Sequence, residues 1–414
     1  PDIDIDVESD RRLEIYDAIY KRFGKDRVAC ISMRETYRVR HAIRDVGAAL
    51  GLPITEIDAF AKAFPRVSAR KAKKVLQELP ELKKSSFAKL FSQGNLDLYL
   101  DLVEKLDCLP RHLAMHPCGV ILSDKSLLDR TPVEFSAANY PMSQFDKDDV
   151  ELMGFLKLDI LGIRMQSAMA YSVSEIKRIN NLDINLDKIA LDDQKTFRLI
   201  QSTKTLGCFQ IESPGQRELI GKFGPESFND LIIDISLFRP GPVKSDMISP
   251  FLGVRHGLSP MKQIHKDLDW ILKETEGVVV FHEQVIQIIA QLTGVTLAVA
   301  DEKRRELGDI QGQQRVCDWF FPTALANGYE LAVVEKVWEV LRAFASFGFC
   351  KAHAAAFALP TYQSAWLKTH HTAAFLAGVL THDPGMYPKR VIVDDARQWG
   401  IEILPIEINK SNKD

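Results

Sequence analysis

The chain has 414 residues, of which 46% are hydrophobic, and 53 basic residues against 56 acidic ones give a net charge of -3. This composition is ordinary for a globular protein with about two or three core-bearing units, and the charge excludes a uniformly basic nucleic-acid-binding chain. The 6 cysteines form no C-x-x-C pair, so we expect neither disulfides nor a thiolate zinc site. No apolar run approaches the length of a membrane span, so we expect a cytoplasmic protein with no membrane partner.

Acidic and branched apolar residues alternate at the start of the sequence, which predicts a strand over residues 1–7. Ser9 or Asp10 is expected to cap the helix that follows, and Gly24 is expected to end it. Because the sequence lacks an initiating Met and starts within a strand pattern, we expect it to be a segment of a longer chain.

The next part of the sequence alternates between helical and strand-like patterns. Residues 34–108 contain short helical patterns broken by Gly and Pro, which predicts a helical insertion. Buried strands are predicted over residues 119–122 and 154–162. Long helical periodicities dominate from about residue 164 onward. They include residues 285–292, 332–347 and 354–380, and a last strand is predicted over residues 401–406.

Carboxylates in the two flanking strand patterns are candidate metal ligands. Asp2, Asp4 and Asp6 fall on one face of the first strand, where like charges repel unless water or cations neutralise them. Hard oxygen ligands select Mg²⁺ or Mn²⁺, but an edge strand that carries acids against aggregation is an equally good interpretation. Asp159 interrupts an apolar strand pattern, so either a shared metal or the neighbouring Lys157 is expected to compensate its charge.

The same acidic segment permits a phosphatase interpretation. Asp4-Ile5-Asp6-Val7 matches the D-x-D-x-[TV] pattern of haloacid dehalogenase-type phosphatases. Those enzymes place an apolar strand before the motif, whereas only Pro1-Asp2-Ile3 precede it here and a basic helical pattern follows. We therefore rank this interpretation below the metal site.

A series of motifs resembles the bacterial C-family DNA polymerases, the family of the DNA polymerase III alpha subunit. These motifs are P-D-I-D-I-D-V-E-S-D-R-R at 1–12, A-I-R-D-V-G at 42–47, Q-F-D-K-D-D-V-E at 144–151, L-K-L-D-I-L-G-I-R at 156–164, G-C-F-Q-I-E-S at 207–213, L-F-R-P-G-P at 237–242, H-E-Q-V at 282–285, A-D-E-K-R-R-E-L-G at 300–308 and F-G-F-C-K-A-H-A-A-A-F-A at 347–358. Their order along essentially the whole chain is more specific than any single match. The E-S-D-R-R continuation and H-D-P-G-M-Y-P-K-R at 382–390 favour an error-prone or actinobacterial-type paralogue.

The resemblance implies template-directed DNA synthesis, a nucleotidyl transfer from dNTP to a primer 3′-hydroxyl that uses two Mg²⁺ ions, with Mn²⁺ as a substitute. The implied metal-binding and catalytic residues are Asp2, Asp4 and Asp159. Asp6 matches an acid of the family motif that is not one of this trio.

The implied fold is α+β and mostly helical. Its parts are a nucleotidyltransferase β-type palm at 1–33 and 109–165, a helical thumb inserted at 34–108, and a large helical fingers domain at 166–414. The strand, helical insertion, strand and long-helix order found above agrees with this arrangement.

Basic residues of the expected thumb are candidate DNA contacts. A charge run of this kind is usually a solvated helix face, but its place in the thumb favours contact with the phosphates of primer–template DNA. The expected DNA-binding residues are Arg38, Arg40, Arg44, Arg70, Lys71, Lys73 and Lys74.

The expected fingers carry residues at positions where the family binds template or triphosphate. The implied nucleotide-binding residues are Arg239, Arg304, Arg305, Lys351 and His353. Guanidinium groups suit bidentate phosphate contacts, whereas a structural role is the alternative for the histidine. Two departures from the family pattern concern the grip on the triphosphate. The family's lysines are missing from 307–310, and Phe357 replaces a common Tyr.

His112, His116 and Cys118 are a further candidate ligand set, since the two histidines have helical i, i+4 spacing. Pro117 would break such a helix, and H-P-C-G-V resembles a palm loop of the family that carries a histidine without a transition metal. We therefore expect structural roles for these residues.

Regions that flank this segment in the family are not in the sequence. They include the Gly- and Ser-rich loop before the first carboxylate and the downstream clamp-binding region, so we expect the segment alone to polymerise poorly or not at all. The implied partners are primer–template DNA and dNTP and, for a longer parent chain in the bacterial nucleoid, the sliding clamp and other replisome subunits. The alternative from another class is a non-catalytic module that binds primer–template DNA.

Overall fold

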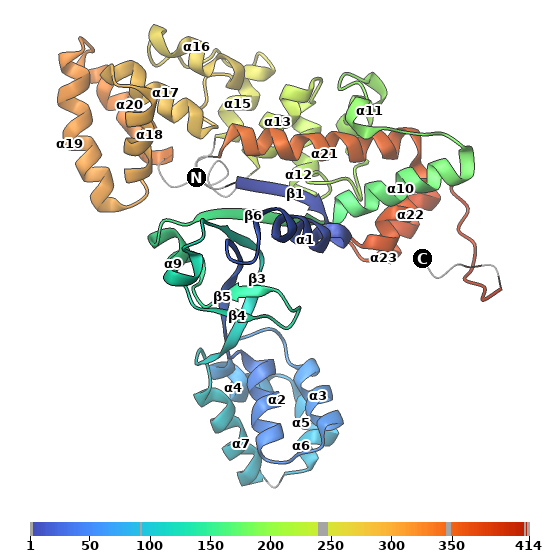
Figure 1. Ribbon diagram of the computed structural model, residues 1–414. Helices are drawn as coiled ribbons and strands as arrows, with labels where there is room; N and C mark the ends of the chain where they lie inside the picture. Colours follow the sequence, from blue (N-terminus) through green and yellow to red (C-terminus); the bar gives the residue numbers. More distant parts are fainter. Residues whose placement is uncertain (1–2, 92, 239–246, 345–348, 410, 412–414) are drawn as a thin grey trace. The chain divides into compact units, whose positions relative to one another are not determined.

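The computed structural model describes residues 3–91, 93–238, 247–344, 349–409 and 411, and the chain forms two compact units, Pro1–Gly162 and Ile163–Asp414 (Figure 1). The fold is α+β and predominantly helical, as predicted. Within the described ranges no single helix has the length and apolar character needed to cross a membrane, and one bent pair, His282–Thr293 with Leu297–Glu306, has them only in combination.

The first unit contains a mixed sheet of 6 strands in the order β1-β6-β3-β2-β5-β4. The strands are β1 (Ile3–Glu8), β2 (Val28–Thr36), β3 (Pro110–Leu122), β4 (Val133–Phe135), β5 (Pro141–Ser143) and β6 (Leu156–Ile163). Strand β3 runs antiparallel to both β2 and β6, while β5 runs parallel to β2. The strands predicted at both ends of this unit are confirmed as β1 and β6, and the strand predicted over 119–122 is the end of the longer β3.

The first part of β2, residues 28–31, is buried on both faces, which explains why its sequence is a continuous apolar run without alternation. Val28 and Cys30 pack in one cluster with Tyr16 of α1 (Arg12–Phe23), whereas Ala29 and Ile31 pack in another with residues of α8 (Leu127–Arg130) and α9 (Lys147–Leu152). The sequence prediction missed this strand, because it assigned no strand between the first helix and the helical insertion. Residues 34–36 of the expected insertion are the end of β2.

The helices of the first unit flank the sheet or form the insertion between β2 and β3. They are α1 (Arg12–Phe23), α2 (Val39–Ala49), α3 (Ile54–Ala63), α4 (Ala72–Glu78), α5 (Pro80–Lys83), α6 (Ser86–Lys89), α7 (Gln93–Lys105), α8 (Leu127–Arg130) and α9 (Lys147–Leu152). The insertion α2–α7 has its own apolar core, in which Phe60 stacks on Phe87 with ring centroids 4.4 Å apart. Gly24 ends α1 as predicted, but the predicted cap is wrong, because Arg11 precedes α1 and no side chain caps it.

In the described part of the second unit, every secondary-structure element that follows β6 is a helix. Its helices are α10 (Arg164–Asn180), α11 (Gln194–Gln201), α12 (Pro214–Phe223), α13 (Phe228–Leu237), α15 (Ile248–Arg255), α16 (Asp269–Leu272), α17 (His282–Thr293), α18 (Leu297–Glu306), α19 (Ile310–Ala326), α20 (Leu331–Phe344), α21 (Lys351–His370), α22 (Thr372–His382) and α23 (Lys389–Gln398). Two apolar clusters form its interior, one built around α10, α13, α21 and α22 and the other around α17–α20.

Two sequence predictions for the second unit are wrong in detail. The pattern over residues 354–380 belongs to two helices, because the backbone at His371 leaves the helical conformation with φ -141° and ψ 50°. The strand predicted over 401–406 does not form, since residues 402–407 are exposed and only a coil is present there. An apolar alternating pattern without a neighbouring strand has no partner for its backbone hydrogen bonds.

Candidate functional site

The two carboxylate-bearing strands at the ends of the first unit are neighbours in the sheet. Strand β1 carries Asp4 and Asp6, and it is hydrogen-bonded to β6, which carries Asp159. The two strands are separated by about 150 residues of sequence, so only the sheet brings the strands that carry these acids side by side. Asp2 lies outside the described residues.

Asp159 has an electropositive neighbour on its own strand. Residues i and i+2 of a strand lie on the same face, and Lys157 Nζ lies 3.0 Å from Asp159 Oδ2. The Asp159 side chain is 21% exposed. Of the two sources of compensating charge that the sequence left open, the structure shows the lysine, and the remaining oxygen, Oδ1, faces β3.

Strand β3 bulges where it passes Asp159. Met115 pairs with Ser32 and Val120 pairs with Cys30, so residues 116–119 of β3 lie opposite the single residue Ile31 of β2. Extra residues in one strand bend it and redirect its side chains, and such bulges often occur beside functional sites. The bulge is held in part by α1, since the Arg12 guanidinium donates a 2.5 Å hydrogen bond from Nη1 to the carbonyl of Pro117.

This bulge brings His116 and Cys118 to Asp159. One donor atom from each of the three side chains lies within 4.8 Å of the other two. The helical spacing considered for His112 and His116 is therefore not realised, because both lie in β3, and His112 is not part of the described group. Burial lowers the pKa of His116 and raises the pKa of Cys118, which favours the neutral imidazole and the neutral thiol.

The predicted DNA-binding cations of the insertion are mostly engaged with neighbouring protein groups. The Arg40 guanidinium donates from Nε to the carbonyl of Phe64 at 2.8 Å, at the end of α3. The remaining ion pairs, measured between nitrogen and oxygen, are Arg44–Asp58 at 2.8 Å, Arg70–Asp107 at 3.4 Å, Lys73–Asp101 at 2.6 Å and Lys74–Glu78 at 3.7 Å. Lys71 is exposed and has no ion-pair partner among the described residues.

Several of these cations nevertheless surround one cavity. It has a volume of about 570 Å³ and is lined by Arg38, Arg40, Arg44, Arg66, His41, Val39, Val67 and Ser68. Four guanidinium groups around one opening produce a positive potential that attracts phosphates. The sequence prediction missed His41, although it lies between the predicted contacts Arg40 and Arg44.

The two arginines predicted at the nucleotide site of the second unit share one carboxylate. Arg304 and Arg305 of α18 both pair with Asp301 at 2.9 Å. Burial opposes ionisation of Asp301, but hydrogen bonds from these two guanidinium groups lower its pKa. Arg305 is 74% exposed, so most of its donors face solvent. Arg239 lies outside the described residues.

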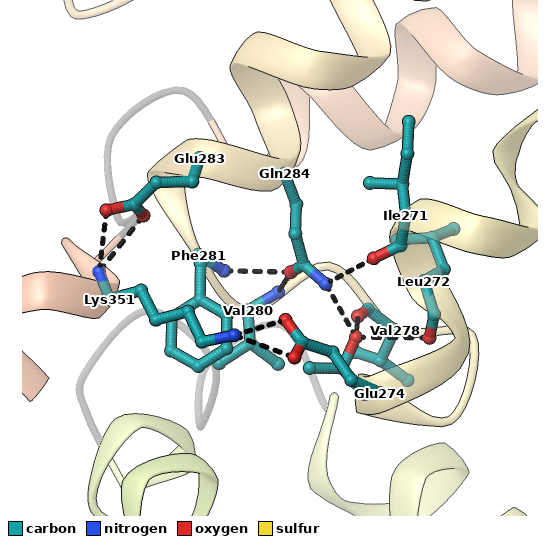
Figure 2. A network of polar contacts seen from close by, with 10 residues as sticks. Ile271, Leu272, Glu274, Val278, Val280, Phe281, Glu283, Gln284 and Lys351 are labelled. Atoms are coloured by element: carbon teal, nitrogen blue, oxygen red, sulfur yellow. Dashed lines mark hydrogen bonds and ion pairs between the residues drawn. The ribbon is translucent and has the colours of Figure 1, made fainter. Parts of the chain in front are cut away.

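Lys351, the first residue of α21, is held by two glutamates (Figure 2). Its ammonium contacts Glu274 at 2.7 and 2.8 Å, while its backbone N–H donates to both oxygens of Glu283 at 3.0 Å. Glu283 therefore neutralises the positive end of the helix. The sequence prediction missed both glutamates, although the second lies in the H-E-Q-V motif.

A buried glutamine connects the backbone near Glu274 to the start of α17, which carries Glu283 (Figure 2). The Gln284 amide is 2% exposed and accepts hydrogen bonds from the backbone N–H groups of Val280 and Phe281 at 2.8 and 3.0 Å. Its nitrogen donates to the carbonyl of Ile271 and to the hydroxyl of Thr275 at 3.1 and 2.8 Å. All four hydrogen-bonding positions of the amide are used, so the loop around Glu274 has a defined path.

His353 of α21 belongs to a column of aromatic side chains from α21 and neighbouring segments. Its ring centroid lies 5.3 Å from that of Phe349 and 4.4 Å from that of Phe357, and Phe357 stacks on Phe209 at 5.6 Å. The i, i+4 spacing aligns these rings along one side of the helix. Phe357, which replaces a Tyr common in the resembling family, therefore acts as a support for the imidazole.

Comparison with known proteins gives consistent matches over the whole chain. Residues 1–162 match the family model for the bacterial DNA polymerase III alpha NTPase domain, and residues 165–328 match that for the bacterial DNA polymerase III alpha subunit finger domain. An error-prone DNA polymerase of Symbiobacterium thermophilum is 34% identical over 100% of this chain and 38% of its own length. A DNA polymerase III subunit alpha of Aquifex aeolicus is 32% identical over 100% of this chain and 37% of its own length, and an error-prone DNA polymerase of Pseudomonas syringae is 36% identical over 100% and 40%. The chain thus spans about two fifths of the length of these relatives.

Proposed function

The chain belongs to the family of the bacterial DNA polymerase III alpha subunit, and from this premise we propose that it carries the catalytic part of a template-directed DNA polymerase. The reaction is nucleotidyl transfer from a dNTP to a primer 3′-hydroxyl. The observation that carries the proposal is the adjacency of β1 and β6, which puts Asp4 and Asp159 on neighbouring strands of one sheet.

The residues present fit the divalent cations that this reaction requires. Asp2, Asp4 and Asp159 offer hard carboxylate oxygens, the donor class that Mg²⁺ and Mn²⁺ prefer. Two bound ions would supply stabilisation of the charge that develops on the attacking and leaving oxygens. In the described residues Lys157 occupies one oxygen of Asp159 and so orients this carboxylate.

The domain assignment follows the family. Residues 1–33 and 109–165 form the palm, residues 34–108 the thumb and residues 166–414 the fingers. The separate apolar core of α2–α7 supports an independently packed thumb. Its cavity of about 570 Å³ is proposed to receive a phosphate of primer–template DNA, with Arg38, Arg40 and Arg44 as lining contacts and Arg70, Lys71, Lys73 and Lys74 as further contacts.

In the fingers, the triphosphate is proposed to contact Arg239, Arg304, Arg305 and Lys351. Arg305 is already exposed, whereas Lys351 must exchange Glu274 for phosphate. His353 is proposed to contact the incoming sugar, since its ring is held at a fixed orientation between Phe349 and Phe357.

Flanking regions are proposed to be needed for turnover. The relatives are more than twice as long as this chain, and DNA synthesis, the sliding clamp and other replisome partners are proposed for a parent of that length. The segment alone is expected to bind primer–template DNA but to incorporate nucleotides poorly.

The deciding experiment is single-nucleotide incorporation with Mg²⁺ by a parent-length protein that carries this segment. Asp159→Asn should abolish incorporation while primer–template binding persists, and Asp6→Asn is the control because it removes a nearby acid outside the proposed trio. Unchanged incorporation in Asp159→Asn would remove this residue from the site. Salt-dependent DNA binding with no incorporation by any variant would instead support the non-catalytic DNA-binding module, and hydrolysis of a small phosphomonoester would support the phosphatase.

A further inference from the structure

Two side chains beside Asp159 have no part in the proposed Mg²⁺ chemistry. The bulge of β3 directs His116 and Cys118 towards this carboxylate, and the three donor atoms lie within 4.8 Å of one another. All three residues are only partly buried, so solutes can reach them. The donor set is one nitrogen, one sulfur and one oxygen, which is the chemistry of a borderline-soft cation rather than of Mg²⁺.

The two oxygens of Asp159 have different neighbours. Oδ2 pairs with Lys157 at 3.0 Å, whereas Oδ1 lies 3.7 Å from Cys118 Sγ. A cation between the carboxylate and the thiol therefore leaves the Lys157 ion pair in place. The sulfur also lies 3.6 Å from His116 Nδ1, so it is close to both other donors.

The imidazole is oriented with its acceptor nitrogen inside the bulge. Nδ1 accepts the backbone N–H of Gly119 at 3.0 Å and that of Cys118 at 3.4 Å. An imidazole nitrogen has one lone pair, so a cation bound at Nδ1 must displace these two backbone donors, and this competition limits its affinity.

The backbone of the bulge is held in place by its neighbours, so the side chains of His116 and Cys118 are already positioned before a cation binds. A Cβ on Gly119 would meet Ile31 Cδ1 at 2.8 Å and His116 Nδ1 at 3.1 Å, so a larger residue at this position would require these side chains to shift. The carbonyl of Pro117 accepts hydrogen bonds from Arg12 at 2.5 Å and from the Tyr16 hydroxyl at 3.4 Å. Constraint of the ligand-bearing strand lowers the entropy that binding must overcome.

We propose that His116, Cys118 and Asp159 form a binding site for one Zn²⁺-class divalent cation, and that occupation of this site inhibits Mg²⁺-dependent DNA synthesis by withdrawing Asp159. As the metal–sulfur bond forms, the Cys118 thiol releases its proton to solvent. Three protein ligands leave a fourth position for water. Cation binding stands on the geometry alone, whereas the inhibition rests on the proposed polymerase function.

The binding half is tested on this chain with Zn²⁺ in the presence of excess Mg²⁺, by competition with a chromophoric chelator, and with Cd²⁺, whose thiolate complexes absorb in the ultraviolet. One ion per chain is expected. Cys118→Ser and His116→Gln should each weaken binding about tenfold or more, and Cys118→Ser should remove the Cd²⁺–thiolate absorbance. Cys108→Ser, which removes an exposed cysteine outside the cluster, is the matched control. Equal Zn²⁺ affinity in wild type and both cluster variants would overturn the site.

The inhibition half is tested with the parent-length protein, and the rate of each variant is normalised to its own rate without Zn²⁺. The Zn²⁺ concentration that halves incorporation should rise about tenfold or more in Cys118→Ser and should not change in Cys108→Ser. Equal inhibition of these two variants would overturn the inhibitory role. Zn²⁺ binding lost in the cluster variants, together with no incorporation by any protein, would uphold the cation site and reject the polymerase function.

Discussion

Replacement of Glu274 by Gln should strengthen the binding of the incoming nucleotide. If Lys351 contacts the triphosphate, its ammonium must first leave Glu274, which it contacts at 2.7 Å. The side chains are 34% and 37% exposed, and a pair of this kind contributes about 0.2–1 kcal/mol after solvent screening. Removal of the competing carboxylate should therefore lower KM for dNTP by up to about fivefold, with little change in kcat.

The assay is steady-state single-nucleotide incorporation by the parent-length protein at low ionic strength. Glu276→Gln is the matched control, because it removes the same charge two residues away. Within the described part of the chain, Glu276 makes no ion pair with Lys351. Salt should reduce the effect of Glu274→Gln, since screening already weakens the pair.

A double-mutant cycle gives the result that would refute this reasoning. Lys351→Ala should raise KM, and Glu274→Gln should then have no further effect, because the ammonium it competes for is gone. A fall in KM caused by Glu274→Gln in the Lys351→Ala background would show that the glutamate acts through general charge. An unchanged KM in Lys351→Ala would show that the lysine does not contact the triphosphate.

Four further predictions concern stability and DNA binding. The Lys368 side chain is 0% exposed and its ammonium lies 2.7 Å from Asp395, so Asp395→Ala leaves a buried unpaired charge. This should lower the free energy of unfolding by about 3–5 kcal/mol. In thermal denaturation, Lys368→Met in the same chain should recover most of the lost stability. Burial disfavours the ionised Asp193, yet hydrogen bonds from Thr196 and His370 lower its pKa to about 2. Since this pKa lies below that of the unfolded chain, the ionised side chain stabilises the fold by about 2 kcal/mol at neutral pH. This stabilisation is lost as the pH falls from about 4 to 2. Asp193→Asn should therefore be less stable than wild type at pH 7 and nearly equal to it at pH 2, and a constant difference would contradict this. Lys71→Ala should reduce the slope of log K against log salt for duplex DNA by about one. Arg40→Ala should lower thermal stability as well as DNA affinity, because its donors hold the end of α3 and the residue also lines the proposed phosphate cavity, and a loss of affinity without a loss of stability would contradict this double role.

Local pattern was enough to predict β1, β6, the helical insertion and the long helices of the second unit. Each of these has a periodicity that depends only on nearby residues. Strand β2 was missed because it is buried on both faces, and a short apolar run does not distinguish a strand from a buried helix. The strand predicted over 401–406 failed for the opposite reason, because its alternating pattern has no partner strand.

The candidate site depended on contacts that the sequence does not encode locally. The acids of β1 and β6 could be singled out by residue type, but the adjacency of the two strands depends on strand order. His116 and Cys118 are two residues apart, which is the spacing of residues on one face of a strand. Had the whole of β3 been predicted as a strand, this spacing would have grouped the two side chains. Their approach to Asp159 results from a bulge opposite Ile31, and the length of that bulge follows from the register of two strands about 80 residues apart.

The segment around Phe281 belongs to both cores of the second unit. Val280 and Phe281 pack in the cluster with α21, whereas Val279 and Val285 pack in the cluster with α17–α20. Phe281 also pairs with Phe349 in a β-bridge, and the N–H of His282 donates to the carbonyl of Phe349 at 2.9 Å. Opening of either core must disturb this shared segment, so amide hydrogen exchange should report one cooperative unfolding unit across both. A nucleotide bound at Lys351 would then slow amide hydrogen exchange in α17–α20 as well as in α21. The two cores of the second unit would thus respond together to nucleotide binding.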